Sequence, residues 1–68
     1  MKQLNKGDSI LLTKMPPVRF GIDPQGHLFV GETYVVDKHT PYFDMLMVMG
    51  SGVVLEKGEY KEVRWAGN

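Results

Sequence analysis

Cysteine is absent from this chain, and other features that would narrow its function are also scarce. Without cysteine, disulfides, thiol chemistry and zinc sites built on thiolates are excluded. Lysine plus arginine and aspartate plus glutamate number eight each, so the basic excess typical of a dedicated nucleic-acid binder is missing. No apolar run is long enough to span a membrane, and the start lacks a charged-then-apolar signal segment. These absences predict a soluble, cytoplasmic protein.

The length of 68 residues predicts one domain over residues 1–68. A chain this short buries only about 60% of its unfolded surface, so we expect a modest stability. Domains of this size often need a disulfide, a metal or oligomerisation to hold together. Because cysteine is absent, oligomerisation stays open.

Short pieces rich in valine, tyrosine, phenylalanine and isoleucine are separated by glycine and proline, a pattern that predicts strands. No window has the three- and four-residue apolar spacing of a helix. The expected strands lie around residues 10–12 and 34–36, over 43–49, over 53–58 after a Gly-Ser-Gly turn, and near residues 63–65. Tyr60 is assigned to a short helical turn before the last strand, which carries Val63 and Trp65.

Residues 16–26 are predicted to form one long loop, because their two consecutive prolines have no N–H to give to a central strand. Phe20 and Ile22 are expected to tuck back on the rest of the domain. Small all-β chains avoid exposed edges by closing on themselves. We therefore expect an all-β fold, a small five-stranded SH3-like β-barrel with a long first loop.

A pattern of glycine, aspartate and apolar residues runs along almost the whole chain. It comprises Gly7-Asp8, Ile10 and Leu12, Gly31 with Tyr34 and Val36, Asp44 with Leu46 and Val48, and the closing "EYKEV". In this respect the chain resembles small bacteriophage proteins of SH3-like barrel fold, mostly of unassigned function. The similarity to KOW-type modules of transcription and translation factors is more distant. The resemblance implies a fold more than a role, and a host-cell cytoplasmic location for a phage-encoded protein.

Three methionines, Met45, Met47 and Met49, alternate with Leu46 and Val48 in one expected strand. Since alternate side chains of a strand point to opposite faces, one face carries leucine and valine and the other only methionine. The resemblance implies that Leu46 and Val48 face the core, which leaves the methionine row at least partly exposed. The alternative is that the row is also core, covered by the long loop.

Catalytic and metal sites are not predicted. His27 and His39 lack the companion that a metal site requires, and both are interpreted as ordinary turn histidines. Residues 37–40 are interpreted as a solvated connection. The serines beside glycine have no recognisable base or orienting partner, and 68 residues rarely enclose an active-site pocket.

The first functional hypothesis is a non-enzymatic protein-binding module, an accessory protein of a phage or mobile element that docks on and modulates a host or phage protein. Exposed apolar patches mark interaction sites, and methionine suits surfaces that adapt to a partner. The expected binding residues are the methionine row and its aromatic and basic neighbours: Met45, Met47, Met49, Phe43, Arg19 and Phe20. Docking would act sterically, by filling a partner's groove or blocking its surface. No cofactor and no membrane is expected.

Two alternatives stay open. A nucleic-acid-binding accessory protein of KOW-like type would use basic residues close to aromatic rings: Lys14, Arg19, Arg64 and Trp65. Against it, Phe20 and Trp65 are equally explained as closing the barrel, and three neighbouring glutamates would oppose a polyanion. A homo-oligomeric structural or ligand-sequestering protein would use the methionine face as a self-interface.

Overall fold

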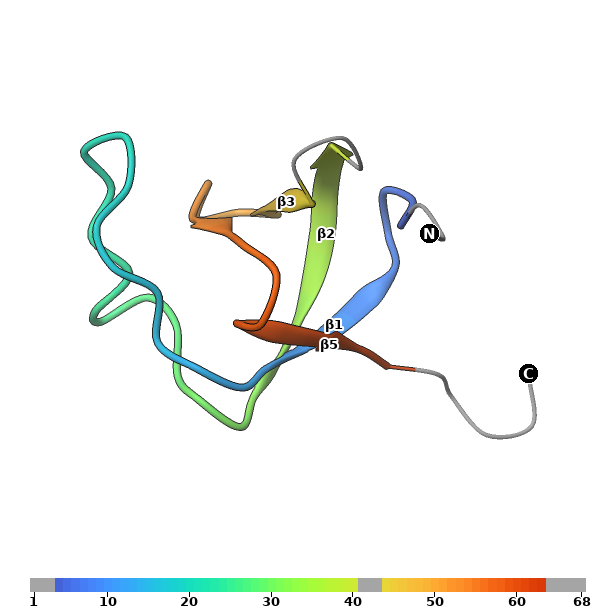
Figure 1. The fold of residues 1–68 in the computed structure, drawn as a ribbon, viewed down its shortest axis with the longest axis horizontal. Helices are drawn as coiled ribbons and strands as arrows, with labels where there is room; N and C mark the ends of the chain where they lie inside the picture. Colours follow the sequence, from blue (N-terminus) through green and yellow to red (C-terminus); the bar gives the residue numbers. More distant parts are fainter. Residues whose placement is uncertain (1–3, 41–43, 64–68) are drawn as a thin grey trace.

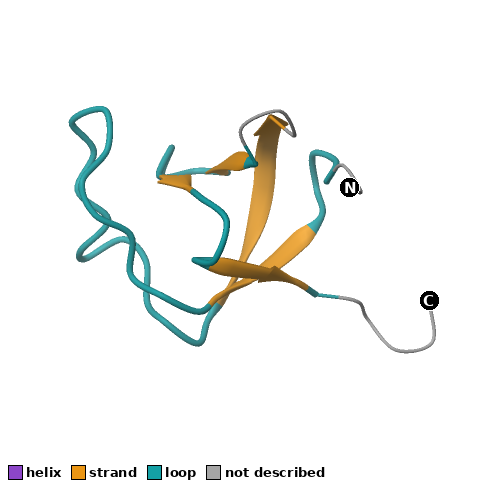
Figure 2. Cartoon of the chain, in the orientation of Figure 1, coloured by secondary structure: helices purple, strands orange, loops and turns teal. Residues whose placement is uncertain are grey.

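The structure, a computed structural model, describes residues 4–40 and 44–63. Five strands are present: β1 (Ser9–Leu12), β2 (Thr33–Thr40), β3 (Met45–Val48), β4 (Val54–Leu55) and β5 (Tyr60–Glu62). They form one antiparallel sheet in the order β4-β3-β2-β1-β5 (Figures 1 and 2). The expected all-β class and the number of strands are confirmed. Over the described ranges, no helix has the length and apolar character needed to cross a bilayer.

The eight-residue strand β2 joins the two halves of the sheet. Its first residues pair with β1, where Tyr34 lies opposite Ile10, and its last residues pair with β3, where His39 lies opposite Leu46. β5 pairs with the other edge of β1, and β4 with the other edge of β3. In Figure 1, β3 and β4 lie on one side of the interior and β1 and β5 on the other. No ladder joins β4 to β5 among the described residues, so closure into a barrel is not seen.

The core is built from the inward-facing positions of the strands. Ile10 and Leu12 of β1 and Leu46 and Val48 of β3 are all buried, which confirms the expected inner face of both strands. Each aliphatic side chain that is fully buried contributes roughly 1.5–3 kcal/mol. Other buried side chains come from β2, β4, the residue before β4, the N-terminal segment and the long loop: Leu4, Leu28, Val36, Val53 and Leu55.

A β-bulge interrupts the pairing of β2 with β3 at Asp37. Val36 lies opposite Val48, but the next pair is Lys38 opposite Met47, so Asp37 has no partner residue. A bulge inserts one residue and reverses the alternation that follows it. Without it, Lys38 would share the inner face with Val36. With it, the inner position after Val36 is His39.

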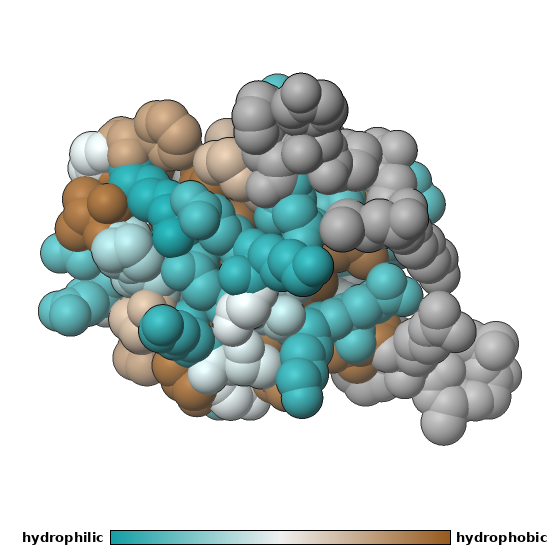
Figure 3. All heavy atoms as spheres, in the orientation of Figure 1, coloured by the Kyte–Doolittle hydropathy of each residue, from teal (hydrophilic) through white to brown (hydrophobic). Residues whose placement is uncertain are grey.

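The loop between β1 and β2 runs from residue 13 to 32, longer than the expected 16–26. It packs on the core through Leu28 and Pro24, which are buried, and Ile22, which is partly buried. Phe20 was expected to pack there too, and this prediction is wrong, since Phe20 is 77% exposed. On the face drawn in Figure 3, hydrophobic side chains at the loop end of the molecule, on the left, are interspersed with hydrophilic ones.

The exposure of Phe20 follows from a tight hairpin inside the loop. Arg19 and Ile22 form an isolated antiparallel bridge, and the Ile22 N–H donates to the Arg19 carbonyl at 3.0 Å. The two residues between them, Phe20 and Gly21, have φ of 53° and 77°. Two consecutive left-handed residues are typical of a type I′ turn, which normally carries asparagine and glycine. Phe20 therefore occupies the tip of the turn, where its ring has no core to reach.

The last strand also differs from its expected form. Tyr60 begins β5 opposite Leu12 and is not part of a helical turn. The edge of β1 explains this, because it offers backbone partners to an extended chain but none to a turn. Val63 follows the strand, and its N–H donates to the Ser9 carbonyl at 3.1 Å. Phe43, Arg64 and Trp65 lie outside the described residues.

The two faces of β3 predict different responses to truncation. Leu46→Ala should lower the free energy of unfolding by about 2–5 kcal/mol, because it leaves a cavity in the core. Met47→Ala, one residue further along the same strand, should cost no more than about 1 kcal/mol, because its side chain lies on the outer face. Urea denaturation measures both. Equal losses would contradict the assignment of the faces.

Candidate functional site

The outer face of β2, β3 and β4 carries a shallow groove lined by methionine. Met45 lies opposite Thr40, and Met47 lies opposite Lys38 on β2 and Val54 on β4. Because paired residues share a face, these side chains stand together on the side away from the core. The groove has a volume of about 190 Å³. Met45 and Met47 are half-buried within it, so the expected partial exposure of the row is confirmed and the core alternative is wrong for these residues.

The apolar row continues past the end of β3. The Met49 N–H donates to the Val35 carbonyl at 2.8 Å, which places the two residues opposite each other beyond the Val36–Val48 pair. Met49 is 42% exposed and Val35 is exposed beside it. The structure thus brings all three methionines to one face, as the alternation predicts.

Arg19 ties the long loop to β4 and to the turn between β4 and β5. Its guanidinium donates to Glu59 through two parallel hydrogen bonds, from Nη1 to Oε1 at 2.7 Å and from Nη2 to Oε2 at 2.9 Å. Its Nε lies 3.1 Å from Oε2 of Glu56, and Nη1 also donates to the Val54 carbonyl at 3.2 Å. Val54 lines the methionine groove, so the hairpin that presents Phe20 is joined to the groove through β4.

The pair between Arg19 and Glu59 is largely removed from water, with side-chain exposures of 17% and 10%. Burial acts to raise the pKa of Glu59, but the Arg19 hydrogen bond, the Glu56 N–H and the positive charges of Arg19 and Lys14 outweigh it and lower that pKa. The hydrogen bond with Glu59 is the main reason why the pKa of Arg19 is raised. Both groups are therefore held charged by each other.

The residues of the nucleic-acid alternative are only partly brought together. Lys14 is exposed near the start of the long loop, and its charge acts on Glu59. The guanidinium of Arg19 is occupied by two carboxylates, which compete with a phosphate for the same donors. Arg64 and Trp65 lie outside the described residues, so their expected contacts stay predictions.

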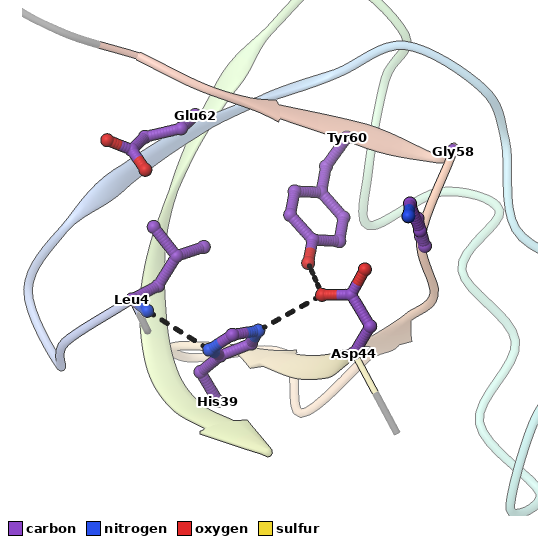
Figure 4. Close-up of a pocket in the computed structure, with 7 residues that line it drawn as sticks. Leu4, His39, Asp44, Gly58, Tyr60 and Glu62 are labelled. Atoms are coloured by element: carbon purple, nitrogen blue, oxygen red, sulfur yellow. Dashed lines mark hydrogen bonds and ion pairs between the residues drawn. The ribbon is translucent and has the colours of Figure 1, made fainter. Parts of the chain in front are cut away.

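Sequence reasoning missed a buried polar network on the inner side of the sheet, drawn in Figure 4. The Leu4 N–H donates to Nδ1 of His39 at 3.0 Å. Nε2 of His39 and the hydroxyl of Tyr60 both reach Oδ1 of Asp44, at 3.3 and 3.1 Å. The His39 side chain is 1% exposed, so its interpretation as a turn histidine is wrong. The solvated connection expected over 37–40 is likewise part of β2.

The bulge at Asp37 is the reason that this network was missed. Strict alternation from Val36 puts His39 on the outer face, in solvent. The shift of register turns His39 inward, opposite Leu46. Asp44 has a φ of 53°, a left-handed conformation that aspartate tolerates better than most residues. The only sequence signal was the chemistry of the residues, one histidine five positions before one aspartate.

No family model, no curated protein and no solved structure matches this chain. The chain is a small all-β domain of five antiparallel strands. The resemblance to phage proteins of SH3-like fold accordingly stays a prediction.

The Arg19–Glu59 pair predicts an unequal response to removing the two acidic partners. Glu59→Gln should lower the free energy of unfolding by about 3 kcal/mol, because it leaves a guanidinium largely buried without its counter-charge. Glu56→Gln is the matched control and should cost less than about 1 kcal/mol, because that side chain is 51% exposed. Urea denaturation at neutral pH compares them.

The same pair predicts a dependence of stability on acid. Because the pKa of Glu59 is lowered in the folded state, its contribution to the free energy of unfolding is complete above the ordinary glutamate pKa. The contribution is lost as the pH falls through the lowered value. Glu59→Gln should remove this part of the acid dependence, and an unchanged pH profile in that variant would contradict the assignment.

Tyr60 predicts a second, alkaline transition. Burial, the hydrogen bond to Asp44 and the negative charge of Asp44 raise the pKa of Tyr60 to about 12. Because this pKa is raised on folding, the contribution of Tyr60 to the free energy of unfolding is complete below the ordinary tyrosine pKa, ~10. That contribution is lost as the pH rises through about 12. The tyrosinate absorbance that wild type shows and Tyr60→Phe lacks should titrate there. A difference that titrates at the ordinary value would refute the burial of the phenol.

Proposed function

We propose that this protein is a non-enzymatic protein-binding module that docks through the outer face of β2, β3 and β4. The observation that carries the proposal is the continuous apolar row of Met45, Met47 and Met49 beside a groove. Protein surfaces usually expose apolar side chains singly, and contiguous rows are typical of interaction sites. Methionine adapts its shape to a partner at low cost, since its side chain is unbranched and flexible.

The groove favours one kind of partner. Its volume of about 190 Å³ lies below the ~300–1,000 Å³ of pockets that take drug-sized ligands. It has room for one large apolar side chain of a protein segment. Lys38 lines the same groove and is exposed, so a carboxylate next to the inserted side chain would find a counter-charge. The partner we propose is a protein segment with an apolar residue beside an acidic one.

Two further features support this reading. Phe20 at the tip of its hairpin is a second exposed apolar group, on a loop that Arg19 ties to β4. An aromatic residue in a left-handed turn conformation costs free energy, and such strain is concentrated at functional positions. We propose that Phe20 contacts the same partner as the methionine row.

We also propose that the sheet is an SH3-like barrel. The support is its strand order, in which β2, β3 and β4 form a meander and β5 returns to pair with β1. With the resemblance in sequence pattern, this makes an accessory protein of a phage or mobile element, acting on a host or phage protein in the cytoplasm, our preferred context.

The test is capture of partners from a bacterial lysate, with and without nuclease treatment, by four purified proteins: wild type, Met45→Ser/Met47→Ser, Phe20→Ser and Val30→Ser. Val30 is an exposed apolar loop residue outside the groove, so Val30→Ser is the matched control. Circular dichroism and urea denaturation first establish that each variant is folded. We expect a protein retained by wild type and Val30→Ser, and lost by the methionine variant and by Phe20→Ser.

Three outcomes would contradict the proposal. Capture that is equal in all four proteins means that the methionine face is not used. Partners that disappear with nuclease point to the nucleic-acid alternative. A methionine-dependent dimer of the pure protein, seen by size-exclusion chromatography, with no other protein captured, points to a self-interface.

A further inference from the structure

A second pocket lies on the inner side of the sheet, opposite the methionine face. It has a volume of about 330 Å³. His39 from β2, Asp44 before β3, Tyr60 from β5 and Leu4 from the N-terminal segment border it (Figure 4). The remaining lining residues are Lys57, Gly58 and Glu62. This pocket plays no part in the docking proposed above.

The hydrogen bonds fix the charge of the histidine. A backbone N–H can only donate, so Nδ1 of His39 must accept from Leu4 and carries no proton. The proton of the neutral ring is then on Nε2, which donates to Oδ1 of Asp44. His39 in this arrangement is neutral.

Asp44 is consequently a carboxylate without a cation. Its two hydrogen-bond donors among the described residues, the ring of His39 and the phenol of Tyr60, are both neutral, and both reach the same oxygen. Among the described residues, His39 is the only ion-pair partner of Asp44 within 4.0 Å. The Asp44 side chain is only 17% exposed. A carboxylate this far removed from water is favoured by a counter-charge, and Oδ2 is the oxygen left to receive one.

The rest of the lining selects the chemistry of the ligand. Asp44 carries a largely buried negative charge, whereas Lys57 is exposed, so the lining disfavours an anion. Leu4 and the ring of Tyr60 provide apolar wall beside the carboxylate. A ligand with an ammonium group on an apolar stem matches both features.

We propose that this pocket binds an alkylammonium group, with Asp44 as its counter-charge. The group is the side chain of a lysine or a free aliphatic amine, which present the same chemistry. The stem lies against Leu4 and Tyr60, and the hydrogen bonds from His39 and Tyr60 hold the Asp44 carboxylate in place.

Two-dimensional NMR titration with N-acetyl-L-lysine N-methylamide tests this, with the norleucine analogue as a neutral control of the same shape. The lysine compound should shift the amide signals of Asp44, Tyr60 and Gly58 in a saturable way, and the norleucine compound should bind at least about tenfold more weakly. 1,5-Diaminopentane separates the two sources: tighter binding of the diamine indicates a free amine, and tighter binding of the lysine compound indicates a polypeptide.

Two variants are expected to change the affinity for the lysine compound in opposite directions, and a third to leave it unchanged. Asp44→Asn keeps the shape and the left-handed tolerance of aspartate and should weaken binding of the lysine compound about tenfold. Lys57→Gln removes an exposed positive charge that lines the pocket and repels an ammonium group, and it should tighten binding roughly twofold. Asp23→Asn is the control, since Asp23 is exposed in the long loop and does not line the pocket, and it should leave binding unchanged.

Three results would overturn the proposal. These are equal binding of the lysine and norleucine compounds, no saturable shift with any amine, and weaker binding in Lys57→Gln. The third result does not depend on whether Asp44→Asn folds. None of them bears on the methionine face, so the failure of one proposal is distinguishable from the failure of the other.

Discussion

The bulge at Asp37 is the constraint on which both candidate surfaces depend. Before it, Val36 faces the core, and after it the inward position falls on His39. The same shift puts Lys38 and Thr40 on the outside, next to Met47 and Met45. One unpaired residue therefore gives the outer groove its charged rim and gives the interior its only histidine among the described residues. A regular strand would have placed His39 on the outer face and Lys38 on the inner face, with the Lys38 ammonium group toward the core.

The Arg19–Glu59 pair has a comparable role for the long loop. A loop of this length has few backbone partners of its own, and its ordering must be stabilised by contacts with the sheet. The pair joins positions forty residues apart, and the same guanidinium reaches the carbonyl of Val54 on the edge strand. Because Arg19 is the first residue of the bridge around Phe20, fixing its side chain also fixes the direction of the hairpin.

Much of the sheet was predictable because alternation is a local property. Leu46 and Val48 were assigned to the core and the methionines to the other face from spacing and resemblance alone, and burial agrees. The prediction for the tip of the long loop was wrong for a different local reason. Phe20 was placed in the core because it is apolar, whereas the turn between Arg19 and Ile22 dictates its position. Of the two turn residues, Gly21 is typical of a type I′ turn and Phe20 is not.

The missed network depended on information that no local pattern contains. A bulge has no reliable sequence signal, and the two partners of Asp44, His39 and Tyr60, lie five and sixteen positions from it on two different strands. The pairing of Arg19 with Glu59 was missed for the same reason: a basic residue beside an aromatic ring suggests a phosphate contact until a distant carboxylate is known. Arg19 and Tyr60 were misassigned because their polar partners are distant in the chain, and His39 because a bulge changed its face.

Each of the two surfaces has a cost to the stability of this small domain. The outer groove exposes apolar area, which lowers the area available to stabilise 68 residues. The inner pocket keeps a carboxylate close to the core, where its hydrogen bonds from the described residues come from neutral donors. A sequence selected for stability alone would replace Met47 with a polar residue and Asp44 with an apolar one. That both residues are present in so small a domain is the physical reason for treating these two places, rather than the well-packed centre of the sheet, as the candidate functional surfaces.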